Sequence, residues 1–167
     1  RNEMGVFYVN QADALVKSGK LEFKGTVPEV VCGILKLSKT MLNFGLEDFT
    51  ATADIPNQAL VMSNSGRHCR LYAYCFSLVE TDDTATEIRM FRNEHERYTK
   101  AIELYEKALK ILTSSDANAV GFGKGKRNQY SKIYESVSWD LQTTCFIWGS
   151  RLQDSTPKEA YSMEEVE

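Results

Sequence analysis

The stretch that decides the fold is "YTKAIELYEKALKIL", which runs from Tyr98 to Leu112. Its apolar residues recur at intervals of three and four, so they share one face of an α-helix. That face alternates small and large side chains, as in Ala101, Tyr105 and Ala108, which lets a second helix approach closely. A coiled-coil seam needs apolar positions over several heptads, and this stretch covers only about two. The pattern therefore predicts one helix of a packed pair.

Composition narrows the class of protein. The chain has 167 residues, 43% of them hydrophobic, and a net charge of −3, which fits one domain or a segment of a larger protein. An acidic balance argues against direct binding of nucleic acid through its phosphates. No apolar run approaches the ~18 residues of a membrane span. The four cysteines lack C-x-x-C spacing, which favours buried intracellular thiols.

Prolines and threonines mark where helices begin. Thr26, Thr84 and Thr156 each precede a glutamate by three residues, the spacing of a capping box. Pro28, Pro56 and Pro157 fall in first turns. The predicted helices cover about 1–18, 28–48, 56–79, 85–113, 129–153 and 157–165. Strand alternation is absent, so the chain is predicted to be all-α.

The connection at about 114–129 is rich in glycine and serine. It lacks the spacing of a phosphate-binding loop, so we expect a long flexible surface loop. Because the chain opens inside a helical pattern and closes on the charged "MEEVE", we expect residues 1–167 to be a single helical-repeat segment and a fragment of a longer protein.

Small residues at repeat spacing indicate which helices pair. Tetratricopeptide repeats combine an A helix carrying W-x2-L-G-x2-Y with a B helix carrying A-x3-F. The predicted A helices are "MGVFY" with Met4, Gly5 and Tyr8, "SGRHC" with Ser65, Gly66 and Cys69, and "WDLQTTCF" with Trp139, Thr143 and Phe146. The predicted B helices are "GILKLSKT" with Gly33, Leu37 and Thr40, and the opening stretch with Ala101, Tyr105 and Ala108. The order A, B, A, B, A predicts a tetratricopeptide-like α-solenoid of antiparallel helical pairs.

The repeat length departs from the standard. Gly66 and Ala101 lie 35 positions apart, where a 34-residue repeat would separate them by about a dozen. We therefore expect lengthened loops within the repeats. The alternative is an irregular helical bundle that matches the pattern by chance.

Several longer stretches extend the pattern to a known family. The stretches "RNEMGVFYVNQADAL" (1–15), "ALVMSNSGRHCRLYA" (59–73) and "YESVSWDLQTTCFIWGSRLQD" (134–154), together with the opening stretch, resemble the erythroid differentiation-related factor 1 family. The resemblance implies a mostly helical, nuclear protein with tetratricopeptide-like repeats, linked to transcription regulation in erythroid differentiation. It brings no catalytic motif.

No constellation in the sequence predicts catalysis. His68 lies beside Cys69, but one such pair makes no metal site, and a packed or surface histidine is the favoured interpretation. Nucleophile and metalloprotease motifs are absent. We therefore expect no enzyme activity, no cofactor and no metal.

A binding surface is the remaining functional prediction. Solenoids recognise partners through the face lined by their A helices, and the polar residues expected there are Asn10, Asn64, Arg67 and Arg70. Arginine pairs well with carboxylates, so the expected partner is a protein, with an acidic or carboxyl-terminal peptide as the ligand. The alternatives are that the arginines are solvated or pair with acids within the fold, such as Glu94 or Glu96, and that the segment is purely structural.

Overall fold

The computed structural model describes residues 1–114 and 124–155, with side chains in the last helix described over 130–154. The helices are α1 (Asn2–Lys17), α2 (Glu29–Ala51), α3 (Ile55–Ser77), α4 (Thr84–Leu112) and α6 (Lys124–Ser155). No strand occurs in these residues, which confirms the all-α prediction. The predicted loop over 114–129 was too long, because α6 begins at Lys124. The predicted helix over 157–165 lies outside the described residues.

Aspartates begin two of the helices. The Asp54 carboxylate accepts the backbone N–H of Asn57 at 3.3 Å, with Pro56 in the first turn of α3. The Asp83 carboxylate accepts the N–H of Thr86 at 2.9 Å. The predicted threonine caps were wrong at two helices. Thr84 is already inside α4, and α2 begins after Pro28 without a side-chain cap.

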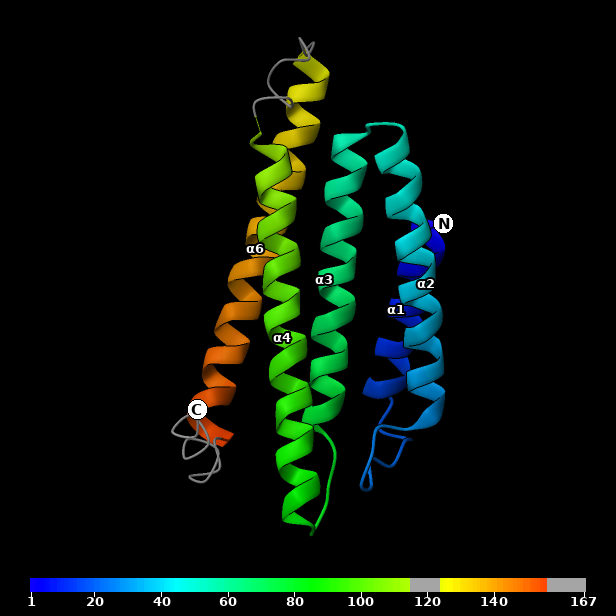
Figure 1. Cartoon of the computed structure of the whole chain (residues 1–167), viewed down its shortest axis with the longest axis vertical. Coiled ribbons are helices and arrows are strands. Elements are labelled where there is room, and N and C mark those ends of the chain that lie inside the picture. The colour runs from blue at the N-terminus through cyan, green and yellow to red at the C-terminus, as the bar shows by residue number, and fades with distance from the viewer. Residues whose placement is uncertain (115–123, 156–167) are drawn as a thin grey trace, which may run out of the picture.

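Helices α3 and α4 form the more extensive antiparallel pair (Figure 1). Gly66 of α3 lies against the ring of Tyr105, and a Cβ on this glycine would be 2.7 Å from the Tyr105 Cε1 and Cζ atoms. One heptad along each helix, Ala73 packs in the same cluster as Tyr98. Small residues on the A helix therefore receive large rings from the B helix, as the sequence predicted.

Helices α1 and α2 repeat this arrangement with aliphatic residues. A Cβ on Gly5 would lie 2.6 Å from Leu42 Cγ, and Ala12 packs in one cluster with Leu35. The buried Ser38 hydroxyl donates to the Gly5 carbonyl at 3.0 Å. The A helix was therefore placed correctly at Gly5.

The predicted face of α2 was wrong. Gly33 faces open space, Leu37 is 48% exposed and Thr40 is exposed. The face that meets α1 carries Ser38 and Leu42 instead.

The extra repeat length is divided unequally between loops and helices. Residues 18–28 form an extended connection between α1 and α2, as expected. Between α3 and α4 only residues 78–83 intervene, so the extra residues there lengthen the helices. The two connections contact each other: Gly25 N–H donates to the Glu80 carbonyl at 2.8 Å, and Glu80 N–H donates to the Phe23 carbonyl at 2.7 Å.

Helix α6 packs on α3 and α4 and continues the A, B, A, B, A order. Its buried face carries Val137, Thr144 and Trp148, and Trp148 stacks on Tyr98 with ring centroids 5.0 Å apart. A bidentate ion pair between Arg151 and the buried Glu94 ties α6 to α4, at 2.8 and 3.0 Å.

The positions predicted for the A-helix motif in α6 do not pack as expected. Trp139 is 72% exposed and Phe146 is 76% exposed, whereas Thr144 rather than Thr143 is the fully buried small residue. The reason is that α3 and α4 both lie on the opposite side of α6 from these two rings.

Candidate protein-interaction site

A groove runs along the face formed by the A helices α1, α3 and α6. It has a volume of about 400 Å³. We call it the A-face groove, and its lining residues are Val9, Asp13, Lys17, Arg67, Arg70, Leu71, Tyr74, Tyr98, Thr143 and Ile147. Three of these residues are cationic and one is acidic. The groove therefore combines an apolar wall with an excess of positive charge.

The three cations differ in how fully they are paired. Lys17 is bound to Asp13 at 2.7 Å, the groove's one acidic residue. Arg70 lies 3.6 Å from the Asp140 carboxylate and donates to Thr144 Oγ1 at 3.3 Å. Arg67 donates only a long hydrogen bond of 3.4 Å, to the neutral Asn10 side chain, and makes no ion pair within the described residues. Arg67 is therefore the cation most available to a ligand.

The floor of the groove is neutral. The Tyr98 side chain comes from α4 and is 1% exposed. Burial, followed by the nearby Glu94 carboxylate, raises the pKa of Tyr98 to about 12. The phenol therefore stays protonated at physiological pH, and the charge of the groove is set by the residues at its walls.

The structure separates the four residues predicted for this face. Arg67 and Arg70 line the groove, and Asn10 meets Arg67 at its edge. Asn64 does not line it. Its amide donates to the Asn2 side chain at 3.1 Å and links α3 to α1. The acids given as examples of internal partners for these arginines are not the ones observed. Arg70 pairs with Asp140 instead, and Glu94 pairs with Arg151.

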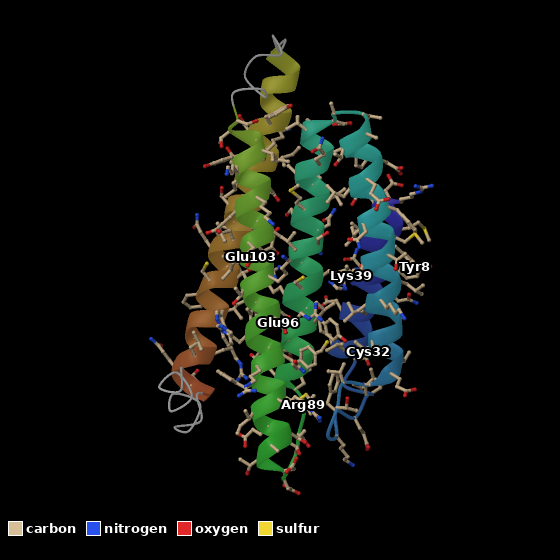
Figure 2. The ribbon with its side chains drawn as sticks, viewed as in Figure 1. Tyr8, Cys32, Lys39, Arg89, Glu96 and Glu103 are labelled. Carbon is tan, nitrogen blue, oxygen red and sulfur yellow. The ribbon has the colours of Figure 1, made fainter. Side chains whose placement is uncertain are left out.

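A second groove lies on the opposite helices and was not predicted. It has a volume of about 610 Å³ and runs between α2 and α4, with α3 as its floor. Figure 2 shows Lys39 on α2 and Glu96 and Glu103 on α4 on either side of α3. The positive and negative residues of this second groove are closer in number than those of the A-face groove. Lys100 is bound to Glu103 at 3.0 Å, and Arg97 stacks over the ring of Tyr72. Because it arises where two helices stand apart, no local motif marks it in the sequence.

His68 is a packed residue in the floor of this second groove. Its Nε2 lies 2.9 Å from the Leu35 carbonyl, and the side chain is 4% exposed. Burial lowers the pKa of His68 to about 4. The neutral imidazole therefore donates Nε2–H to the carbonyl and joins α3 to α2.

The described residues offer no metal site and no membrane span. In residues 1–114 and 130–154, no three His, Cys, Asp or Glu side chains are grouped closely enough to hold a metal ion. None of the described helices combines the length and apolar character needed to cross a bilayer.

Comparisons with known proteins agree with this architecture. A family model described as "Erythroid differentiation-related factor 1-like, TPR repeats" matches residues 1–167. Erythroid differentiation-related factor 1 of Homo sapiens is 33% identical over 169 residues, and that of Mus musculus is 32% identical over 167 residues. Each alignment covers 100% of this chain and 12% of the relative. No solved structure matches the chain. With the repeat packing, the match along the whole chain places this protein in the erythroid differentiation-related factor 1-like family of tetratricopeptide-repeat proteins.

Proposed function

We propose that the A-face groove binds a peptide segment of a partner protein through that segment's carboxylates. Tetratricopeptide repeats of this kind suggest a protein-interaction scaffold, and an A-helix face is where such scaffolds recognise ligands. The partner we propose presents an acidic side chain or a chain-terminal carboxylate to Arg67, with an apolar residue beside it.

The observation that carries the proposal is the unequal pairing of the cations. Arg67 has no carboxylate partner in the described fold, although it stands beside an apolar wall that includes the 43%-exposed Tyr74. A guanidinium in this setting gains a bidentate, charge-assisted contact when a carboxylate arrives. The neighbouring ring and aliphatic side chains supply contact area to the same ligand.

The test compares single variants of the groove. Arg67→Ala removes the free cation without breaking an ion pair, and Lys39→Ala on the second groove is the matched control. Binding is measured by fluorescence anisotropy against an array of acidic peptides, each with a free or an amidated carboxyl terminus. We expect Arg67→Ala to weaken binding by about 1.5–3 kcal/mol, Lys39→Ala to leave it unchanged, and added salt to weaken the wild-type complex.

The same array identifies the type of carboxylate. Loss of binding on amidation assigns the contact to the chain terminus, and retention assigns it to acidic side chains. Equal affinities of wild type and Arg67→Ala for every bound peptide would refute the proposal.

A purely structural role is the second candidate, and the pairing of Arg70 favours it. Arg70 already holds Asp140 and Thr144, so it ties α3 to α6. On this alternative no peptide binds the groove in the array, whereas Arg70→Ala lowers the free energy of unfolding.

The family resemblance extends the proposal to the cell. We propose that the protein acts in the nucleus as a regulator of transcription, as a scaffold with no enzyme activity of its own. The relatives' shared name, erythroid differentiation-related factor 1, supports a regulatory role. Fluorescence microscopy of the tagged protein tests this, and exclusion from the nucleus would refute it.

A further inference from the structure

The hydroxyl of Tyr105 is the one buried side-chain nitrogen or oxygen atom without a hydrogen-bond partner in the part of the chain that the structure describes. The Tyr105 side chain belongs to α4, is 0% exposed and packs against Gly66 of α3. Phenylalanine would fill the same space without burying a polar group that lacks a partner, which is unfavourable. The hydroxyl is therefore a candidate for a role other than packing.

Polar groups that join α3 to α6 next to the A-face groove surround this hydroxyl. Burial raises the pKa of Tyr105 to about 12. The nearby Arg70 lowers this pKa, Asp140 raises it, and the Thr144 side chain also lowers it. The phenol is therefore protonated at physiological pH and can donate a hydrogen bond. The same three residues make the contact between α3 and α6.

Thr144 offers the acceptor that the phenol lacks, but Arg70 already donates to it. Thr144 Oγ1 donates its proton to the Asp140 carbonyl at 2.7 Å and accepts from Arg70 Nη1 at 3.3 Å. Thr144 lies close enough to lower the pKa of Tyr105, yet the two hydroxyls form no hydrogen bond in this arrangement. Because Thr144 is 0% exposed, a donor from inside the fold would have to replace Arg70 there.

Arg70 is held in place by long contacts. Its guanidinium lies 3.6 Å from the Asp140 carboxylate and 3.3 Å from Thr144 Oγ1, whereas strong charge-assisted N–H···O hydrogen bonds measure about 2.7–2.9 Å. The bidentate pair of Arg151 and Glu94, at 2.8 and 3.0 Å, shows the shorter geometry elsewhere on α6. Arg70 also lines the A-face groove, so its guanidinium can turn from α6 toward a bound peptide.

We propose that the Tyr105 hydroxyl is a reserve donor, which bonds to Thr144 Oγ1 when Arg70 turns from α6 toward a peptide in the A-face groove. The proposal rests on the peptide-binding function proposed above. Before binding, Thr144 accepts from Arg70 and the phenol is without a partner. After binding, Thr144 accepts from the phenol and Arg70 donates to the peptide, so every one of these polar groups is bonded. Tyr105 does not line the groove, so it is a positioning residue that acts through Thr144 and Arg70.

A double-mutant cycle tests this exchange of donors without any ligand. Arg70→Met removes the guanidinium but keeps an unbranched apolar side chain, and Tyr105→Phe removes only the hydroxyl. In the wild-type background we expect Tyr105→Phe to leave the urea midpoint unchanged or to raise it, because the hydroxyl has no partner there. In the Arg70→Met background the hydroxyl bonds to Thr144, so Tyr105→Phe should lower the equilibrium constant for folding by about fivefold.

Arg67→Met provides the matched control background. Arg67 also lies near the phenol and lowers its pKa, but it donates to Asn10 and not to Thr144. Tyr105→Phe should therefore have the same effect in the Arg67→Met background as in the wild type. This control separates the loss of a nearby positive charge from the exchange of the donor at Thr144.

The acidic peptides of the anisotropy array test whether the exchange takes part in recognition. We expect Tyr105→Phe to weaken the binding of these peptides by about threefold to tenfold, while its urea midpoint stays unchanged or rises. A residue with a purely structural role would not weaken binding in a protein that is as stable as the wild type.

The other outcomes overturn the proposal. Equal effects of Tyr105→Phe in the wild-type and Arg70→Met backgrounds would show that no exchange occurs. A lower urea midpoint for Tyr105→Phe alone would show that the hydroxyl already has a partner, such as an internal water. Peptide affinities of Tyr105→Phe equal to those of the wild type would remove its role in recognition. If no peptide binds the wild type, the function proposed for the groove fails, whereas the unfolding cycle still decides whether the exchange occurs.

Discussion

Replacing Gly66 with alanine tests the central contact of the fold. The added Cβ would lie 2.7 Å from two ring carbons of Tyr105, whereas carbon atoms in contact prefer about 3.5–4.0 Å. The Tyr105 ring is 0% exposed, so it has no free space to enter. Overpacking of this kind costs about 1–3 kcal/mol, and alanine regains up to ~1 kcal/mol of helix propensity. Because the contact is with a fully buried ring, we take the upper part of the overpacking range, about 2–3 kcal/mol, and we expect a net destabilisation of about 1–2 kcal/mol.

The assay is urea unfolding followed by circular dichroism, with Gly33→Ala as the matched control. Gly33 is also a mid-helix glycine, but its Cβ would meet no atom within 4 Å. The control should therefore gain about 0.5–1 kcal/mol. The Tm of Gly66→Ala should fall by about 2–8 °C. If both variants were stabilised equally, the close approach of α3 and α4 at this glycine would be wrong.

Three further predictions follow from buried or capping side chains. The pKa of His68 is about 4 in the folded protein and 6.5 in the unfolded chain, so the fold favours the neutral imidazole. The stabilisation by neutral His68 is therefore complete above pH 6.5. Acidification to pH 4 should remove about 2–4 kcal/mol of the free energy of unfolding, and His68→Gln should flatten the profile measured by urea titration. Arg151→Gln leaves the buried Glu94 carboxylate without its ion-pair partner and should lower the free energy of unfolding by about 3 kcal/mol, measured by urea unfolding. The control is Arg1→Gln, which breaks an exposed ion pair, and a smaller loss in Arg151→Gln than in this control would contradict the pairing of Arg151 with Glu94. Asp54→Ala removes the α3 cap and should lower stability by ~1 kcal/mol by calorimetry, with Asp82→Ala unchanged as the control.

The helices and one helix face were predictable because their signals are local. Ala101, Tyr105 and Ala108 are all fully buried against the neighbouring helices, as their spacing indicated. Gly66 was likewise placed at the helix contact. A short-range period determines which residues of one helix share a face, and it needs no knowledge of the neighbour.

The choice between competing faces was not local. Helix α2 carries small residues on two sides, Gly33 on one and Ser38 on the other, and only the position of α1 decides between them. The acids predicted to pair with the arginines of the groove were wrong for the same reason. Glu94 seemed available to the arginines of α3, but it is 2% exposed and bound to Arg151 of α6. Pairing across distant helices depends on the packed structure, which periodicity does not encode.

The hydrogen bonds between residues 18–28 and 78–83 have a consequence for recognition. They join the connection that follows α1 to the connection that follows α3, beyond the groove residues Lys17 and Tyr74. These hydrogen bonds restrain the relative motion of the two connections at this end of the A-face groove. A peptide bound as proposed would not have to restrict that motion, so less conformational entropy would be lost on association at this end of the groove.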